Sequence, residues 1–245
     1  MSRTIVITGS GSGMGLATAE LLRERGDRVI GVDLKNVDVI ADLSTEAGCT
    51  QMVKDVTALA NGHIDAVIAN AGVLGPDALC YAVNYHGAVR TLEGLRPLLT
   101  RSPAPRAVVT VSYAAASASA LNMAKALERG ENPTRTSPEE TAYSASKLAI
   151  ARWIRRTAPS AEWTQAGILL NAVCPGLVDT PMLSEAMKMP SVSALIEATP
   201  LKRLAQPREL AEVFAFLASA ANSFMTGQLL YVDGGLEAAT RPEMV

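Results

Sequence analysis

The sequence predicts a single α/β domain in which a seven-stranded parallel sheet carries helices on both faces. Three observations support this prediction. The 245 residues are enough for one large core. Hydrophobic residues make up 49% and aromatic residues 4% of the chain, which fits strands covered on both sides. Apolar, β-branched runs alternate with helix-compatible stretches, as in a doubly wound parallel sheet. No internal repeat or long linker divides residues 1–245 into two domains.

The expected elements follow from the spacing of apolar residues along the chain. Runs rich in β-branched residues predict strands at 4–8, 28–32, 37–41, 64–69, 106–111, 167–173 and 228–232. Stretches with helical spacing lie between them at 16–25, 50–60, 85–99, 142–157 and 207–220. Right-handed crossovers then predict the strand order 3-2-1-4-5-6-7.

Two stretches interrupt this alternation. Residues 114–141 form an insertion that is first rich in Ala and Ser and then charged. Its run Ala-Leu-Asn-Met-Ala-Lys-Ala-Leu-Glu-Arg-Gly predicts a helix that ends at Gly130. Residues 181–200 are apolar and rich in Met between prolines. Long excursions from a compact domain are often lids or interfaces, so we expect a function for both stretches.

Composition and charge argue against several classes of function. A net charge of -2 with no Lys/Arg run leaves no basic surface for nucleic acid. Cys49, Cys80 and Cys174 form no CxxC pair, and His63 and His86 belong to no metal-binding motif. We therefore expect reduced thiols and no metal site. The N-terminus enters a strand without an apolar signal segment, and no run predicts a membrane span, so we expect a cytoplasmic protein.

A glycine-rich loop connects the first strand to the first helix. The loop reads Thr8-Gly9-Ser10-Gly11-Ser12-Gly13-Met14-Gly15. Glycines let the backbone approach a pyrophosphate and aim a helix N-terminus at its charge, which predicts a Rossmann dinucleotide site. The second strand ends at Asp33, whose carboxylate would bind the adenosine ribose and repel a 2′-phosphate. We therefore expect NAD, with NADP as the weaker alternative because Lys35 is close in sequence.

Tyr143 and Lys147 lie four residues apart in the run Tyr-Ser-Ala-Ser-Lys. Residues with this spacing share a helix face, so the Lys147 ammonium could lower the pKa of the Tyr143 phenol. A phenol with a lowered pKa is a suitable general acid and base. Such pairs also arise by chance in amphipathic helices, and the glycine loop in the same chain makes the catalytic interpretation stronger.

Taken together, these motifs resemble the short-chain dehydrogenase/reductase family over nearly the whole chain. The matching residues are Thr8, Gly9, Gly13, Gly15, Asp42-Leu43, Asn70-Ala71-Gly72, Asn84, Ser112, Tyr143, Lys147, Pro175-Gly176, Thr180 and Val232-Asp233-Gly234-Gly235. The resemblance implies a cofactor site formed by Gly9, Ser12, Gly13, Met14, Gly15, Asp33, Leu34, Asp42, Leu43, Asn70, Ala71, Gly72, Tyr143, Lys147, Pro175, Gly176, Val178 and Thr180.

The resemblance also implies a mechanism. Tyr143, as phenolate, would take the hydroxyl proton of an alcohol while hydride leaves for the nicotinamide. Lys147 would stabilise the phenolate and hold the nicotinamide ribose, and Ser112 would hydrogen-bond the substrate oxygen. Asn84 would order a water beside Lys147, although an amide that only binds backbone groups is an equal alternative. The bulky Tyr113 after Ser112 departs from the family pattern, and Ser117 and Ser119 lie nearby, so an offset of the catalytic serine from Ser112 stays open.

The long separation between Ser112 and Tyr143 marks a subgroup of the family. This chain is similar to bacterial 3α-hydroxysteroid dehydrogenase/carbonyl reductases. They share the insertion, a short segment between the second strand and Asp42, and a tail that here contains Arg241-Pro242. Coniferyl-alcohol and terpene-alcohol dehydrogenases resemble it as well. The insertion is linked with altered dimer contacts in such relatives, so we expect a homodimer or a homotetramer.

The resemblance places a substrate lid at about residues 181–200. We expect substrate contacts from Tyr113, Met182, Leu183 and Met187, and an apolar wall that also includes Met189, Leu195 and Ile196. An oligomer contact or an ordinary core helix is the alternative for this segment. No charged clamp for a phosphate or carboxylate is evident, and we expect Arg152, Arg155 and Arg156 to form a solvated helix face.

We therefore predict an NAD-dependent oxidoreductase that interconverts a secondary alcohol and a ketone. The substrate would be apolar and cyclic, such as a hydroxysteroid or a terpenoid. One alternative is a catalytically silent dinucleotide-binding regulatory protein on the same fold. Others are an aryl- or coniferyl-type alcohol dehydrogenase and an epimerase or dehydratase, for whose extra substrate domain the chain leaves little room.

Overall fold

The computed structural model describes residues 2–137, 140–187 and 190–243. Within these residues, seven strands form one sheet in the order β3-β2-β1-β4-β5-β6-β7, and all neighbours are parallel. The strands are β1 (Thr4–Thr8), β2 (Arg28–Asp33), β3 (Val39–Ile40), β4 (Ala66–Ala69), β5 (Arg106–Thr110), β6 (Leu169–Pro175) and β7 (Leu229–Val232). The predicted parallel sheet and its strand order are confirmed.

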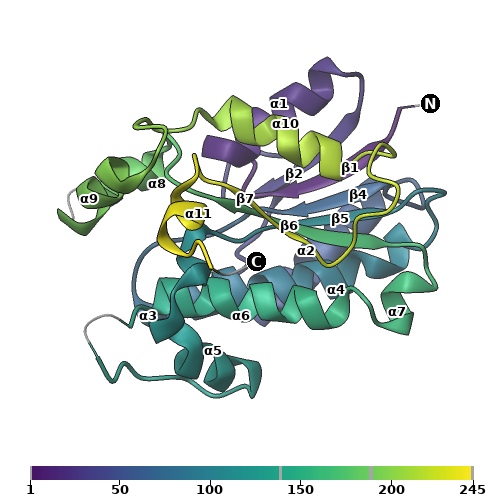
Figure 1. Ribbon diagram of the computed structural model, residues 1–245. Coiled ribbons are helices and arrows are strands. Elements are labelled where there is room, and N and C mark those ends of the chain that lie inside the picture. Colours follow the sequence, from purple (N-terminus) through teal and green to yellow (C-terminus); the bar gives the residue numbers. More distant parts are fainter. Residues whose placement is uncertain (1, 138–139, 188–189, 244–245) are drawn as a thin grey trace.

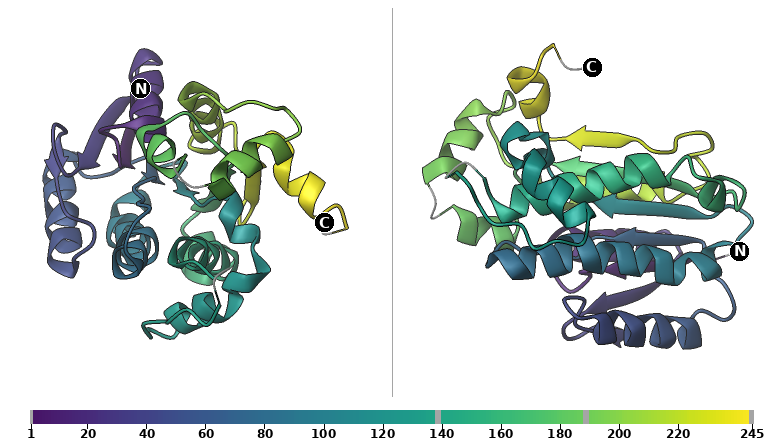
Figure 2. Two further views of the ribbon diagram at one scale, coloured as in Figure 1. Left: turned by 90° about the vertical axis from the view of Figure 1, so that its left-hand side faces the viewer. Right: turned by 90° about the horizontal axis from the view of Figure 1, so that it is seen from below.

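Helices cover both faces of this sheet (Figure 1). One face carries α1 (Gly13–Glu24) and α10 (Pro207–Leu217), and the other carries α2 (Glu46–Leu59), α4 (Ala88–Leu99) and α6 (Ala142–Thr157). Figure 2 shows α2, α4 and α6 side by side under the sheet. The shorter elements are α3 (Asp77–Cys80), the π-helix η1 (Tyr81–Gly87), the 3-10 helices η2 (Tyr113–Ala116) and η3 (Ala118–Ala120), α5 (Leu121–Glu128), α7 (Ala161–Thr164), α8 (Pro181–Ala186), α9 (Pro190–Ala198) and α11 (Leu236–Thr240).

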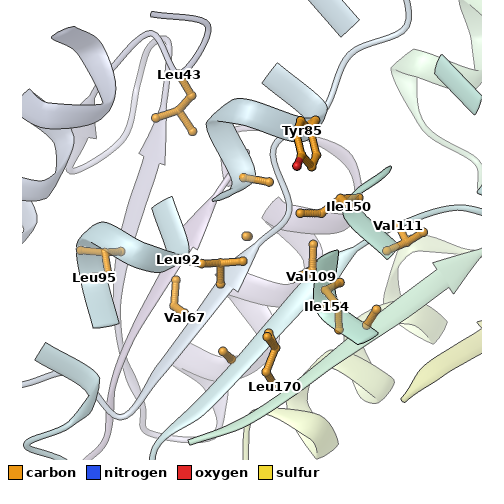
Figure 3. Packing of buried hydrophobic residues seen from close by; sticks show 14 of the residues in the cluster. Leu43, Val67, Tyr85, Leu92, Leu95, Val109, Val111, Ile150, Ile154 and Leu170 are labelled. Carbon is orange, nitrogen blue, oxygen red and sulfur yellow. The ribbon is translucent and has the colours of Figure 1, made fainter. Parts of the chain in front are cut away.

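Alternation of side chains along the strands divides the core into two clusters. Val67 and Val109 point toward α4 and α6, where they meet Leu92 and Ile150 (Figure 3). Their sequence neighbours point to the α1 and α10 side, where Phe214 is fully buried. Because both faces are apolar, the strands appear in the sequence as continuous hydrophobic runs. No helix among the described residues is long and apolar enough to cross a membrane.

The insertion folds as a separate layer on α6. Its helix α5 ends at Glu128, and Gly130 follows with a φ of 77°, as the sequence predicted. Glu128 accepts hydrogen bonds from Arg152 Nε at 2.6 Å and from Arg156 Nη1 at 3.1 Å. The Arg152 and Arg156 side chains remain 35% and 50% exposed, so this face is solvated and also carries an acidic partner that the insertion brings onto α6.

The ends of the strands define where a ligand can bind. β1 lies between β2 and β4, so the chain leaves β1 and β4 toward opposite faces of the sheet. Such a switch point opens a crevice at the carboxyl ends of the strands. α8, α9 and α11 gather at this end of the sheet (Figure 1), so the consecutive helices α8 and α9 lie at the same end as α11 from later in the chain.

Candidate active site

The glycine-rich loop after β1 packs so closely that Gly9 and Gly15 have no room for a side chain. Gly9 has a φ of +69°, and a Cβ there would lie 2.8 Å from the Ala71 Cα. A Cβ on Gly15 would lie 2.0 Å from the Gly9 carbonyl oxygen. The cap residue Ser12 makes no side-chain bond to α1, whose first turn holds no acidic residue. The N–H groups at this helix end are therefore suited to a pyrophosphate.

Asn70 connects the ends of three strands beneath the loop. Its side-chain nitrogen donates to the Gly9 carbonyl at 3.3 Å, and its side-chain oxygen accepts from Thr110 Oγ1 at 2.9 Å. Thr8 Oγ1 in turn accepts from the backbone N–H groups of Asn70 and Ala71, both at 3.1 Å. These bonds explain why the predicted Asn-Ala-Gly motif follows β4, and they give Asn70 a role in shaping the loop.

A groove of about 350 Å³ runs from the loop along the ends of β2 and β3. The predicted cofactor residues that line it are Gly9, Ser12, Gly13, Met14, Asp33, Leu34, Asp42, Leu43, Asn70, Ala71, Gly72 and Thr180. The Asp33 carboxylate is fixed there by the N–H of Gly11 at 2.9 Å and of Leu34 at 2.7 Å. Hydrogen bonds from Ser44 lower the pKa of Asp42. The groove is thus lined by two carboxylates and by residues at the beginning of α1.

A second cavity, of about 290 Å³, adjoins the groove at the ends of β5 and β6. Both spaces are lined by Met14, Asn70, Gly72, Thr180 and Met182. The structure places the remaining predicted chemistry in this second cavity, whose lining includes Ser112, Tyr143, Lys147, Pro175, Gly176 and Val178. A ligand in the groove can therefore reach the cavity that holds the phenol and the ammonium.

Helix α6 presents Tyr143 and Lys147 on one face, as predicted. The helix begins after Thr141, whose hydroxyl accepts from the Ser144 N–H at 3.1 Å. Lys147 is 3% exposed, and its Nζ donates to the Thr110 carbonyl oxygen at 2.9 Å. Its Nζ lies 5.9 Å from the centre of the Tyr143 ring. Burial lowers the pKa of Lys147 to about 8.

The Tyr143 phenol responds mainly to burial. Burial raises its pKa, and a hydrogen bond with the Ser112 side chain opposes that shift. The prediction of a lowered Tyr143 pKa is therefore wrong, because the net shift of this pKa is upward. The physical reason is that the Lys147 ammonium is bound to the Thr110 carbonyl and faces the ring, while burial destabilises the phenolate.

Ser112 is the serine that the fold brings to the cavity. It caps η2, and its hydroxyl accepts from the Ala114 N–H at 3.1 Å. Ser117 and Ser119, the alternatives in the sequence, hydrogen-bond each other at 2.8 Å and are not among the cavity residues. Tyr113 lines the cavity next to Ser112, so the departure from the family pattern falls within the wall of this cavity.

Asn84 lies in the π-helix η1 and is 1% exposed. Its side-chain oxygen accepts from the Val73 N–H at 2.8 Å, and its nitrogen donates to the Val73 carbonyl at 3.0 Å and to Ser146 Oγ at 3.1 Å. The structure thus shows the backbone-binding amide. The water relay stays a prediction, although Asn84 and Lys147 both approach Gly72, where a Cβ would lie 3.3 Å from each.

The apolar wall of the cavity comes from α8, α9 and α11. Met182, Leu183 and Leu195 line it, whereas Met187 is 38% exposed and is not among the lining residues. Met189 lies outside the described residues. Lining residues that sequence reasoning missed are Leu74, Thr110, Val111, Ala114, Thr141, Leu177, Ala186, Val192 and Leu236. Leu236 could have been found, because it begins an apolar run immediately after the Asp-Gly-Gly motif.

Comparison with known proteins gives consistent matches. Residues 132–237 match a family model described as enoyl-(acyl carrier protein) reductase. The chain is 36% identical to the 3-alpha-hydroxysteroid dehydrogenase/carbonyl reductase of Comamonas testosteroni, over 97% of this chain and 98% of that protein. It is 32% identical to the cis-4-hydroxycyclohexanecarboxylate dehydrogenase of Sinomonas cyclohexanicum, over 96% and 97%. The crystal structure of the 3-alpha-hydroxysteroid dehydrogenase from Pseudomonas sp. B-0831, complexed with NADH, superposes with a TM-score of 0.92 at 36% identity, covering 99% of this chain and 100% of that one.

Proposed function

The chain belongs to the short-chain dehydrogenase/reductase family, and we propose that it interconverts a secondary alcohol and a ketone on an uncharged cyclic substrate, with NAD as cofactor. The observation that supports this most strongly is the meeting of Ser112, Tyr143 and Lys147 in one cavity that adjoins the dinucleotide groove. The names of two relatives point the same way, since both act on a hydroxyl group carried by a ring.

NAD is the cofactor that the groove suits best. Asp33 lies at the end of β2, where its carboxylate would accept hydrogen bonds from ribose hydroxyls and repel a 2′-phosphate. Because Gly9 and Gly15 exclude a side chain, the loop backbone can pack tightly and approach a pyrophosphate. When bound, the nicotinamide supplies the acceptor or the donor of the hydride. A relative of high structural similarity holds NADH.

The residues of the chain would divide the proton chemistry between them. Ser112 would donate a hydrogen bond to the substrate oxygen, where negative charge develops. Tyr143 would take the hydroxyl proton during oxidation and return it during reduction. Because burial raises the Tyr143 pKa, the protonated phenol predominates at neutral pH and suits reduction. Oxidation requires the phenolate, so we expect its rate to rise with pH.

The lining of the cavity favours an uncharged substrate. Among the described residues that line it, Lys147 is the only one with a charged side chain, and its Nζ is bound to Thr110. A carboxylate on the substrate would therefore enter an apolar wall without a cationic partner, which is costly. We propose that the chain prefers neutral ring alcohols, such as hydroxysteroids or terpene alcohols, to a cyclohexanecarboxylate. The expected homodimer or homotetramer stays a prediction.

Initial rates test this proposal. NAD and NADP would be compared with a hydroxysteroid, a monocyclic terpene alcohol, a hydroxycyclohexanecarboxylate and an aryl alcohol. We expect turnover with NAD on a neutral ring alcohol, and a loss of about 10²- to 10⁴-fold in Tyr143→Phe because the general base is removed. Faster turnover with NADP would contradict the role of Asp33, and a preference for the aryl alcohol would favour an aryl alcohol dehydrogenase. NAD binding with no turnover would favour the regulatory protein.

A further inference from the structure

One wall of the cavity is formed by two segments that are far apart in sequence. Tyr113 of η2 and Leu236 of α11 both line the cavity, and Leu236 is 0% exposed. The Tyr113 hydroxyl lies 3.2 Å from Oγ1 of Thr240, on the same short helix as Leu236. A hydrogen bond therefore joins the wall beside Ser112 to the wall formed by the C-terminal helix.

The direction of this hydrogen bond follows from the other bonds of Thr240. The Thr240 hydroxyl has one proton, which it donates along the helix to the Leu236 carbonyl at 2.9 Å or to the Glu237 carbonyl at 3.1 Å. Its oxygen is thus the acceptor, and the Tyr113 phenol is the donor. The resulting chain runs from the Tyr113 hydroxyl through Thr240 to the backbone of α11.

Helix α11 depends on side-chain bonds for its position. It has 5 residues, too few for a helix that is stable without tertiary support. The Asp233 carboxylate fixes its beginning by accepting from the N–H groups of Gly235 at 3.0 Å and Glu237 at 2.7 Å. Near its end, Arg241 pairs with Glu237 and donates to the Tyr231 hydroxyl at 3.4 Å. Among the side-chain hydrogen bonds described for α11, only the one between Thr240 and Tyr113 joins this helix to a cavity-lining residue of another element.

We propose that Thr240 is a positioning residue for substrate recognition, which acts by holding the Tyr113 ring against α11 and thereby sets the width of the cavity beside Ser112. The proposal rests on the proposed function of this site. Thr240 is not a cavity residue, so its effect on substrate passes through Tyr113 and Leu236. A large ring substrate must press on this wall, whereas a small secondary alcohol leaves space between itself and the wall.

Steady-state kinetics of the full-length chain with NAD provide the first test. Thr240→Val removes the hydroxyl at nearly constant shape, Thr240→Ser keeps the hydroxyl, and Tyr113→Phe removes only the phenol oxygen. With the best ring substrate of the panel, we expect KM to rise about three- to tenfold in Thr240→Val and Tyr113→Phe, as for loss of one hydrogen bond. We expect kcat and the KM of a small alcohol such as propan-2-ol to change less than about twofold in Thr240→Val.

The double variant and the conservative variant make the test specific. The KM of Tyr113→Phe with Thr240→Val should not exceed that of the worse single variant, because both remove the same bond. Thr240→Ser should behave as the wild type. Unchanged KM in Thr240→Val, a loss of equal size in Thr240→Ser, or additive effects in the double variant would each overturn the proposal.

Hydrogen exchange separates failure of this inference from failure of the proposed function. We expect residues 236–240 to exchange faster in Thr240→Val and in Tyr113→Phe than in the wild type or Thr240→Ser. Unchanged exchange in both variants would overturn the proposal whether or not the chain oxidises any alcohol. If no alcohol is oxidised by the wild type, the proposed function fails, and so does any role of Thr240 in recognising such a substrate.

Discussion

The two adjoining spaces of the crevice are built from different parts of the chain. The dinucleotide groove lies against the glycine-rich loop, where a Cβ on Gly9 or Gly15 would collide with main-chain atoms at 2.8 and 2.0 Å. The cavity that holds Tyr143 and Lys147 takes side chains from η2, α6, α8, α9 and α11. A substitution at Gly9 or Gly15 therefore changes the path of the chain beside the groove, whereas one in the cavity changes the chemistry or the shape offered to a substrate.

Gly15→Ala should have the largest effect on the groove. The added Cβ would lie 2.0 Å from the Gly9 carbonyl oxygen and 2.6 Å from the side-chain nitrogen of Asn70, so the loop must shift. We expect a loss of about 1–3 kcal/mol in the free energy of unfolding, as for other overpacked sites. We also expect the Kd for NAD to rise at least about tenfold. Urea denaturation and a dinucleotide titration measure the two effects.

Gly75→Ala is the matched control, because a Cβ at Gly75 would meet nothing within 4 Å. It should change neither the free energy of unfolding by more than about 0.5 kcal/mol nor the affinity for NAD. If both glycine variants behaved alike, the close packing of the loop would not be what distinguishes the groove.

In the cavity, unlike in the glycine-rich loop, one substitution should remove function and increase stability. We expect this of Lys147→Met. Burial lowers the Lys147 pKa from 10.5 to about 8. Below pH 8 the ammonium is charged in the folded and the unfolded chain, so the cost of burying it is full. Between pH 8 and 10.5 the unfolded chain binds more protons, so folding gains stability as pH rises. At 1.36 kcal/mol per pKa unit, the cost removed is at most about 3 kcal/mol.

We therefore expect Lys147→Met to be inactive and more stable than the wild type at neutral pH. The lost hydrogen bond to the Thr110 carbonyl reduces this gain. The difference between the two should shrink when urea denaturation is repeated at about pH 9.5, because Lys147 is then largely neutral in the folded chain. A stability difference between Lys147→Met and the wild type that does not depend on pH would contradict the lowered pKa of Lys147.

The smallest expected effect lies outside both spaces, at the contact between the insertion and α6. Glu128 has a side chain that is 14% exposed and pairs with Arg152 and Arg156. We expect Glu128→Gln to lower the free energy of unfolding by about 1 kcal/mol and to leave NAD binding unchanged. Glu131→Gln is the control, since the Glu131–Arg129 pair is more than half exposed and should contribute almost nothing. Equal losses in both would show that Glu128 does not hold the insertion.

The sheet and the groove could be predicted because their signals are local. Each buried strand is an apolar run, and the Gly9 to Gly15 loop carries its constraint in its own residues. Tyr143 and Lys147 were predicted to share a face because helix geometry fixes that relation.

The remaining features depend on contacts between segments that are distant in sequence. The Tyr143 pKa is set by burial, which no local pattern reveals. The Asn84 side chain is hydrogen-bonded to the backbone of Val73, which precedes it by 11 positions. Arg152 pairs with Glu128 only because the insertion folds back onto α6. Met187, which was expected to contact substrate, is not among the residues that line the cavity, whereas Leu236 reaches the cavity from near the other end of the sequence.

A fluorescence titration with NADH, performed on Tyr143→Phe and Gly15→Ala beside the wild type, tests the division between groove and cavity most directly. The account predicts that Tyr143→Phe binds NADH within about fivefold of the wild type although it has lost turnover, and that Gly15→Ala loses binding. Binding that is lost equally in both variants, or kept in Gly15→Ala, would contradict it.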